Sequence, residues 1–321
     1  MKNYIYILLC FCVFSVKAQE LKLTPYSQYL VENPFVISPA FAGVDDEVYK
    51  LRISGVAQWL GLSNAPSTQT ISFDTRLDEN SGVGIIMYND KNGHTSQIGG
   101  QLTYAYHLDL NYDKYEYLSF GLSYKFNQFK ISTDDFDDGS GNGHNDPNVG
   151  AGQKVINHNF EVGALYRLDR YYVAINASNI LNKKISVFEG EEPSKLRNYY
   201  LYTGYTFLSR SEEYEYEPSV YFKYYEGDGR SATDINFKAR MLVEDGYFWA
   251  GINSRFINDQ SFEPVSISPL IGMNKKKFYV GYGFQLNINE AKTFNNSGTH
   301  LITLGYNFDN GKYNTSWSNN N

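Results

Sequence analysis

The sequence predicts an all-β protein, a closed antiparallel outer-membrane β-barrel of about 14 strands. Three observations predict this fold. Apolar and polar residues alternate along segments of about ten residues, roughly fourteen such segments occur, and the links between them differ systematically in length. The mean hydropathy of −0.44 does not oppose a membrane barrel, because lumen-facing polar side chains cancel lipid-facing apolar ones in any average.

The alternation has a period of two residues, which places successive side chains on opposite faces of a strand. Residues 98–108, 118–127, 278–288 and 302–308 each have one apolar face and one polar or small face. Strands that cross hydrocarbon at a tilt need about 9–11 residues, whereas strands of soluble domains average about 5–6. The pattern predicts that outward residues such as Leu122 face lipid, and that Ser123 faces a lumen polar enough to tolerate an arginine.

The segments are placed by their central residues. These are Ile53, Phe73, Ile85, Leu102, Leu122, Ala164, Ile175, Thr203, Val220, Phe237, Ala250, Ile271, Tyr282 and Leu304. The alternation is broken near Ile85, Ile175 and Ala250, so these three are the least regular. An even number of segments agrees with the even strand counts of bacterial barrels.

The links between segments alternate in length. The links after the sixth, tenth and twelfth segments are short and lie near residues 169–170, 244–246 and 274–277. Those after the fifth and seventh are long and span 130–157 and 180–197. Barrels have short periplasmic turns and longer outside loops. We therefore expect the odd-numbered links outside the cell and both chain ends in the periplasm.

Residues 1–18 match the pattern of a secretory signal peptide, with Lys2 before an apolar run and a small residue at the expected cleavage point. We predict cleavage after Ala18. A membrane anchor is disfavoured, because the apolar run is shorter than the ~20 residues that a spanning helix needs. A lipoprotein acylated at Cys10 or Cys12 is the other alternative, which the bulky residue before each cysteine disfavours.

The remaining chain divides into three parts. Residues 19–47 contain three prolines and show no sustained alternation, so we expect an N-terminal plug of the lumen or a periplasmic segment rather than a strand. Residues 48–308 form the transmembrane β-barrel. Residues 309–321 are polar and rich in asparagine, and we expect them to form a C-terminal tail.

Charge and cysteine content exclude several function classes. The formal charge is −7, and it becomes −9 once Lys2 and Lys17 leave with the signal, so a basic nucleic-acid-binding surface is not expected. Both cysteines lie in the signal, which leaves the mature chain without disulfides, thiol nucleophiles or cysteine-bound metals. No later stretch holds 18 consecutive apolar residues, so we expect no helical membrane span after the signal.

The acidic stretch 134–146 holds weak calcium candidates, namely Asp134, Asp135, Asp137 and Asp138. Clustered carboxylate oxygens suit Ca²⁺. The spacing is not that of an EF-hand, however, and a solvated loop rich in glycine and asparagine explains the same residues. We therefore assign no metal and no cofactor.

No catalytic arrangement is visible in the sequence. The histidines show no metal-ligand spacing; they are His94, His107, His144, His158 and His300. A lipase mechanism would need a serine beside a histidine base, and neither a Gly-x-Ser-x-Gly motif nor a paired Ser and His is present. We predict that the protein is not an enzyme and that His107 faces the lumen in a structural role.

Charged side chains of both signs are expected on the lumen face. The cations are Lys125, Arg167, Lys223, Lys238 and Arg240, and the acids are Glu161, Glu217 and Asp234. One interpretation is a selectivity lining. The other is pairing of opposite charges that fills the lumen, and the mixture of signs favours this second interpretation.

Several different short motifs follow one another along the chain. They are Asn33-Pro34, Pro39-Ala40-Phe41-Ala42-Gly43, Gln58-Trp59, Ala65-Pro66-Ser67-Thr68, Ser72-Phe73-Asp74-Thr75, Tyr88-Asn89-Asp90-Lys91-Asn92-Gly93, Tyr104-Ala105-Tyr106, Leu118-Ser119-Phe120-Gly121-Leu122, Gly298-Thr299-His300 and Leu304-Gly305-Tyr306-Asn307-Phe308. In this order and spacing the sequence resembles the PorP/SprF family, membrane proteins of the Bacteroidetes type IX secretion system. The resemblance runs from about Asn33 to Phe308, while 134–157 and 182–198 depart from it.

The resemblance implies an outer-membrane barrel that works with other type IX secretion components and binds or anchors a secreted surface protein such as an adhesin. It supplies no catalytic residues, and the departing loops are candidates for partner choice. The alternative function is an outer-membrane diffusive channel or hydrophobic-compound transporter. A channel needs an open or gated lumen, whereas an anchor can be plugged; the mixed-sign lumen and the proline-containing segment favour the plugged barrel.

Overall fold

The computed structural model describes residues 28–45, 48–59, 64–131, 154–181, 197–288 and 298–309. The predicted signal peptide with cleavage after Ala18, the polar tail beyond residue 309 and the calcium candidates lie outside the described residues; these candidates are Asp134, Asp135, Asp137 and Asp138. Within the described residues, no helix is long and apolar enough to cross a membrane.

The described chain is built almost entirely of strands. Their bounds are β1 Val48–Gln58, β2 Ser67–Arg76, β3 Ser81–Asn92, β4 Thr95–Asn111, β5 Glu116–Ile131, β6 Lys154–Leu168, β7 Tyr171–Ser178, β8 Asn198–Tyr205, β9 Phe207–Leu208, β10 Tyr214–Tyr225, β11 Ser231–Val243, β12 Gly246–Ile257, β13 Glu263–Lys275, β14 Phe278–Asn287 and β15 Thr299–Asp309. The 3-10 helices η4 (Tyr112–Lys114) and η6 (Asn258–Gln260) lie in links between strands.

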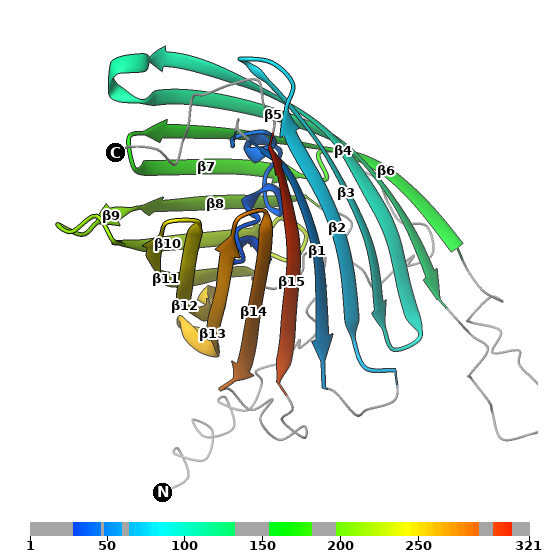
Figure 1. Cartoon of the computed structure of the whole chain (residues 1–321). Helices are drawn as coiled ribbons and strands as arrows, with labels where there is room; N and C mark the ends of the chain where they lie inside the picture. The colour runs from blue at the N-terminus through cyan, green and yellow to red at the C-terminus, as the bar shows by residue number, and fades with distance from the viewer. Residues whose placement is uncertain are drawn as a thin grey trace, which may run out of the picture.

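The strands close into one antiparallel barrel (Figure 1). Neighbours in sequence pair with each other, and β15 pairs back onto β1 with Leu304 opposite Ile53. Strand β9 continues the line of β8, because both pair with β10: Gly204 lies opposite Ser219, and Phe207 opposite Tyr216. The wall therefore has fourteen strand positions, and the predicted closed antiparallel barrel is confirmed.

All fourteen predicted central residues lie within strands. This includes Ile85 of β3, Ile175 of β7 and Ala250 of β12, where the alternation is broken. In a membrane wall every backbone N–H and C=O needs a partner on a neighbouring strand. A segment with an irregular pattern therefore still forms a strand when both of its neighbours do.

Side chains alternate between the outside of the barrel and the lumen, as the sequence pattern predicts. On β5, Leu122 is 51% exposed and Ser123 is fully buried. On β4, Leu102 is exposed and its neighbour Thr103 is buried. The outward apolar side chains form the surface that meets the hydrocarbon of an outer membrane.

The two ends of the barrel carry links of different length. At the end that we call the long-link end, the links are 59–66, 132–153, 179–197, 226–230, 258–262 and 288–298, with the two-residue turn 93–94 as the exception. At the opposite, short-link end, the links are 77–80, 112–115, 169–170, 244–245 and 276–277, with 206–213 as the exception because it contains β9. The length pattern expected from sequence thus holds at eleven of the thirteen links.

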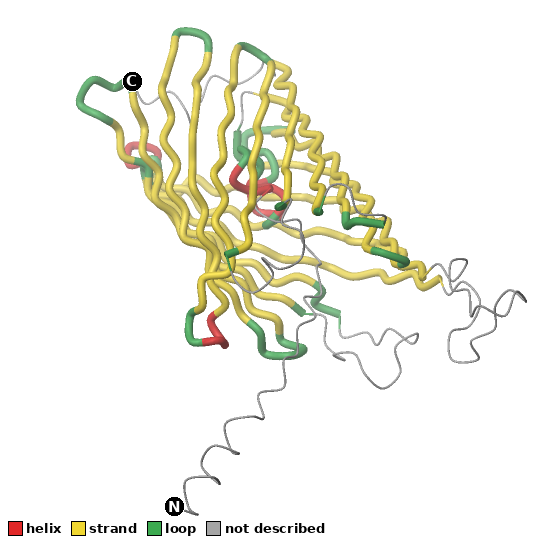
Figure 2. Tube along the Cα trace, turned by 90° about the horizontal axis from the view of Figure 1, so that it is seen from below, coloured by secondary structure: helices red, strands yellow, loops and turns green. Residues whose placement is uncertain are grey.

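A segment from the N-terminal part of the chain lies inside the barrel (Figures 1 and 2). It contains the 3-10 helices η1 (Gln28–Leu30), η2 (Pro34–Val36) and η3 (Pro39–Phe41). We call residues 28–45 the lumen segment. It is the described part of the 19–47 segment, for which the sequence left a plug and a periplasmic position open.

Candidate functional site

The lumen segment follows a tight path because prolines begin two of its helices. Pro34 opens η2 and Pro39 opens η3. Proline suits this position, because the N–H that it lacks would have no partner within the helix. The Ser38 hydroxyl accepts a hydrogen bond from the Ala40 amide at the start of η3 (3.4 Å). Two of the family-like motifs therefore encode a compact turn sequence rather than a strand.

Apolar side chains of the lumen segment pack inside one part of the barrel. Val31 and Ala40 are fully buried, and Phe35 is nearly so. They form one cluster with inward-facing wall residues that include Leu165 and Tyr202. Burying a large apolar side chain stabilises a protein by about 1.5–3 kcal/mol, so the hydrophobic effect holds the lumen segment as it holds a soluble core.

Glycines occupy wall positions where the lumen segment passes closest. A Cβ added at Gly84 would lie 2.4 Å from the Phe35 ring, and one added at Gly121 would lie 2.3 Å from the carbonyl carbon of Pro39. Real Cβ atoms do not approach other atoms so closely, so these positions accept only glycine while the lumen segment stays in place. The wall and the segment are matched in shape.

Backbone hydrogen bonds fix the segment near the short-link end. The Gly43 amide donates to Asp74 Oδ2 (3.1 Å), and the Gly43 carbonyl accepts from Arg76 Nε (2.6 Å). Gly43 has a φ of +68°, a conformation that favours glycine. Two charged wall residues of β2 thus hold the Gly43 backbone in place by hydrogen bonds.

His107 holds Ala42, the residue before Gly43. Its Nε2 lies 3.0 Å from the Ala42 carbonyl oxygen, and its Nδ1 lies 2.7 Å from Ser119 Oγ. A carbonyl only accepts, so Nε2 carries the proton and Nδ1 accepts from the serine hydroxyl. The geometry gives His107 the structural role that the sequence indicated.

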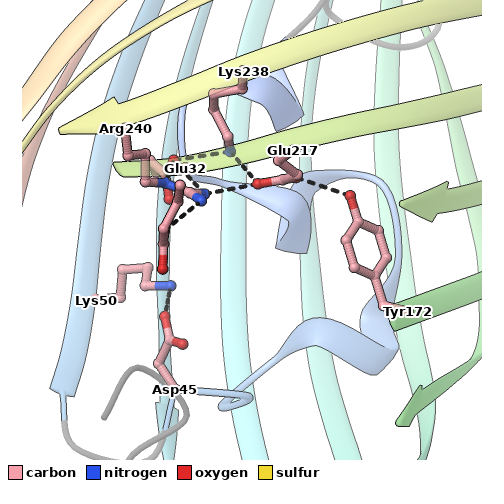
Figure 3. Close-up of polar contacts among 8 residues, drawn as sticks. Glu32, Asp45, Lys50, Tyr172, Glu217, Lys238 and Arg240 are labelled. Carbon is pink, nitrogen blue, oxygen red and sulfur yellow. Dashed lines mark hydrogen bonds and ion pairs between the residues drawn. The ribbon is translucent and has the colours of Figure 1, made fainter. Parts of the chain in front are cut away.

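Ion pairs fix the first half of the segment (Figure 3). Glu32 Oε1 lies 3.0 Å from Lys238 Nζ and 3.1 Å from Arg240 Nη2. Both cations also reach Glu217, at 3.1 and 2.9 Å, and the Tyr172 hydroxyl donates to the same carboxylate (2.9 Å). The lumen segment thereby completes a network that two wall strands begin.

The network changes the acidity of Glu32. Burial alone would raise the pKa of this carboxyl, but the adjacent Arg240 and Lys238 outweigh burial and hold the pKa well below its ordinary value. Burial would likewise raise the pKa of Asp45, at the other end of the segment, and its ion pair with Lys50 lowers it instead (Figure 3). Both carboxyls are therefore ionised at neutral pH.

Tyr29 also attaches the lumen segment to the wall, at a point nearer the long-link end. Its hydroxyl donates to Asp234 Oδ2 (3.1 Å), and Asp234 forms a two-point ion pair with Arg255 at 2.7 and 2.8 Å. The Tyr29 ring also packs against the rings of Tyr202 and Tyr221, with centroids 5.2 and 4.8 Å away. The lumen segment is thus anchored along its whole length.

The structure brings most of the predicted lumen charges together as pairs. Lys125 lies 2.7 Å from Glu161, and Lys238 and Arg240 share Glu217. Of the other predicted cations, Lys223 lies over the Tyr225 ring and Arg167 over the Tyr117 ring. Opposite charges fill this lumen, which favours the second of the two interpretations.

Sequence reasoning missed the partners that lie far away along the chain. Glu32, Asp45 and Arg255 were not singled out, although each completes one of the pairs described above. One available signal was Glu32 itself, an acid directly before the Asn33-Pro34 motif in a segment otherwise mostly apolar. A buried acid needs a cation, and the lumen cations of β11 were the candidates.

A polar cavity remains inside the barrel toward the long-link end. Strands β3 to β8 line it, with Tyr88, Lys125 and Asn157 among the lining residues. Ser38 and Pro39 of the lumen segment contact β5 and β6 further toward the short-link end. The segment therefore fills one part of the lumen and leaves this cavity on the other side.

The sequence predicts neither a metal site nor a serine beside a histidine base in the described residues. No group of three or more His, Cys, Asp or Glu side chains in the described residues is placed to hold a metal ion. The histidine rings that face outward contact tyrosine hydroxyls, His158 with Tyr124 and His300 with Tyr282. The structure corrects the sequence-based statement that no serine and histidine are paired, because Ser119 and His107 are hydrogen-bonded. Both are buried, and the other ring nitrogen of His107 faces the Ala42 carbonyl, so this pair holds the lumen segment.

Solved structures with a similar fold are membrane barrels. The monoaromatic hydrocarbon channel TodX, in a deltaS2 mutant form, matches with a TM-score of 0.54 and 9% identity, over 86% of this chain and 94% of that one. The Ralstonia pickettii toluene transporter TbuX matches with a TM-score of 0.51 and 9% identity, over 85% and 92%. The monoaromatic hydrocarbon channel CymD matches with a TM-score of 0.50 and 10% identity, over 88% and 92%. At such low identity these matches show the fold alone.

The sequence comparisons identify the family. No curated protein sequence is similar enough to count as a match. The sequence model of the family described as type IX secretion system membrane protein PorP/SprF, in contrast, matches residues 18–306, which is most of the chain. This range includes both the lumen segment and nearly all of the barrel wall. The chain therefore belongs to the PorP/SprF family of type IX secretion system membrane proteins and is a β-barrel of the outer membrane.

Proposed function

We propose that this protein is a plugged outer-membrane barrel that binds or anchors a secreted surface protein, such as an adhesin, at its outer face. The observation that carries the proposal is the lumen segment, which is packed against the wall and tied to it by Glu32, Gly43 and Asp45. An anchoring protein needs a stable body and an exposed binding surface, and it needs no open pore.

The binding surface in this proposal is the long-link end. Its longest links join β5 to β6 and β7 to β8, at 132–153 and 179–197. Barrels place longer loops outside the cell, and loops on a rigid scaffold are where binding residues gather. Other type IX secretion components, and the bilayer around the wall, are the remaining partners. We propose no catalytic activity.

The proposal is tested in the native host by deleting the gene and restoring it. Surface proteins are then labelled on intact cells and quantified in the cell and medium fractions. We expect one or a few surface proteins to move into the medium, or to be lost, in the deletion strain only. An unchanged surface in the deletion strain would contradict the proposal.

The transporter alternative predicts a different result. Purified protein in a planar bilayer should conduct ions, or accelerate uptake of monoaromatic compounds in cells, if the barrel serves as a channel. For a plugged anchor we expect neither, and we expect co-purification of the barrel with the affected surface protein after crosslinking on cells. Uptake that depends on the gene, with an unchanged surface, would favour the transporter.

A further inference from the structure

The cavity toward the long-link end is lined mainly by amide side chains. They come from β4, β5, β6 and β8 and from the start of the link after β7, and they are Gln97, Asn127, Asn157, Asn159, Asn179 and Asn198. The cavity also lies at the base of the two longest links, because those links connect β5 to β6 and β7 to β8. A bound group would therefore enter from the proposed partner-binding end.

Two of these amides have oxygens without a hydrogen-bond partner. Asn127 of β5 and Asn157 of β6 lie opposite each other in the strand register. The Oδ1 atom of each is buried and accepts no hydrogen bond from any described residue. Leaving a buried polar atom unpaired destabilises a fold, so two adjacent unpaired acceptors indicate a place that suits donor groups.

The charge in the cavity is already balanced. Lys125 Nζ lies 2.7 Å from Glu161 Oε2 and 2.9 Å from Ser178 Oγ. The amine therefore offers no uncompensated charge to an anion, and the carboxylate offers none to a cation. The site suits an uncharged group with N–H or O–H donors.

The aromatic side chains of the cavity are engaged with the wall. A Cβ added at Gly99 would lie 2.3 Å from the Tyr88 ring, so that ring rests on the Gly99 backbone. The Tyr200 ring stacks on Tyr221, with centroids 5.9 Å apart and planes within 13°. A sugar ring would need a free aromatic face to stack on, which favours a peptide over a glycan.

We propose that this cavity, with a volume of about 30 Å³, receives one neutral polar side chain of the secreted partner protein, whose N–H or O–H groups donate to Asn127 and Asn157. The inference rests on the proposed function and deepens it, because it names the place and chemistry of partner capture. Amide oxygens accept hydrogen bonds from side-chain amide and hydroxyl groups, and a buried contact at the centre of an interface contributes more than a contact at its rim.

The first test fills the cavity. Asn157→Trp places a large side chain inside it, whereas the matched variant Ile156→Trp places the same side chain on the outer surface, where Ile156 is 57% exposed. We expect Asn157→Trp to reduce surface retention of the partner by about tenfold or more, as blocking a central contact does, and Ile156→Trp to leave it unchanged. Heat-modifiable migration on gels verifies that both variants fold.

The second test does not depend on a bulky substitution. With both native cysteines in the predicted signal, Asn157→Cys creates a single thiol in the cavity, and Asp228→Cys creates a control thiol in the exposed link 226–230 of the same end. Intact cells are treated with a membrane-impermeant maleimide, with and without a functional type IX translocon. We expect Asn157→Cys to be protected only in secreting cells, and Asp228→Cys to react equally in both.

The outcomes separate this inference from the proposed function. If gene deletion lowers surface retention but Asn157→Trp does not, the function stands and the cavity is not the capture site. If gene deletion has no effect, the proposed function itself fails. Protection of Asn157→Cys in non-secreting cells would overturn the inference, and protection removed only by stripping surface polysaccharide would assign the cavity to a glycan instead.

Discussion

The Ala42 backbone passes so close to Gly82 that a Cβ added at Gly82 would lie 2.1 Å from the Ala42 carbonyl oxygen. The same carbonyl faces His107 Nε2 at 3.0 Å. The lumen segment and the wall thus meet backbone to backbone at this point, without an intervening side chain.

This contact predicts that Gly82→Val displaces the lumen segment. Overpacking of a close contact costs about 1–3 kcal/mol, and backbone atoms cannot move aside as a flexible side chain can. We expect a lower denaturation midpoint and a rise in single-channel conductance in planar bilayers. Gly55→Val is the control, because a Cβ at Gly55 would meet nothing within 4 Å. Equal behaviour of the two variants would show that the lumen segment does not occupy this position.

Removal of the Glu32 carboxylate should weaken the attachment of the first half of the lumen segment to the barrel wall. Glu32→Gln leaves Lys238 and Arg240 with Glu217 as their shared acid. Breaking a buried pair is strongly destabilising, and the remaining acid offsets part of the loss. We therefore expect the free energy of unfolding to fall by about 1–3 kcal/mol, which chemical denaturation in detergent measures. Asp228→Asn, which breaks an exposed pair with Arg230, should cost no more than about 1 kcal/mol.

Acid should loosen the lumen segment. The pKa of Glu32 is held below its ordinary value of 4.5, and that of Asp45 below 3.8. Stability from a carboxyl with a lowered pKa is fully present above the ordinary value and is lost as the pH falls toward the folded value. We expect conductance to rise as the pH falls below about 4.5. The Glu32→Gln and Asp45→Asn double variant should lose much of this response, and an identical response would assign it to other groups.

Leu122→Arg should impair insertion, because Leu122 faces outward near the middle of β5 and an arginine there costs about 2–4 kcal/mol. Leu122→Phe changes size without charge and should be tolerated. Ser123 faces the lumen, as the sequence predicts, but its packing there argues against tolerance of an arginine. Ser123 is fully buried and hydrogen-bonded to Gln101 and Thr103 at 2.9 and 2.7 Å. A membrane-insertion titration in which Arg and Phe at position 122 behave alike would contradict the assignment of this face to lipid.

A tag inserted between Gly141 and Asn142 should be labelled on intact cells. The insertion lies in the longest link, which the length pattern places outside the cell. Removal of residues 134–148 should leave the barrel in the membrane and reduce surface display of the partner. A tag that becomes accessible only after the outer membrane is opened would show that the orientation is inverted.

Most of the barrel wall could be predicted from local pattern alone. The period of two residues sets which face of a strand meets lipid, and it does so within a few residues of sequence. This is why Leu122 and its outward neighbours were placed correctly, and why the fourteen segment centres all fall in strands. The order and spacing of short motifs also sufficed to identify the family.

The contents of the lumen were decided by the tertiary structure. Glu32 and Lys238 are 206 positions apart in sequence, and Tyr29 and Asp234 are 205 apart. No local pattern relates residues so distant; they meet only because barrel closure brings β10, β11 and β12 around the lumen segment. The sequence showed that polar and charged residues line the lumen. Whether water or protein fills that space depends on where residues 28–45 lie, which close packing against Gly82, Gly84 and Gly121 determines.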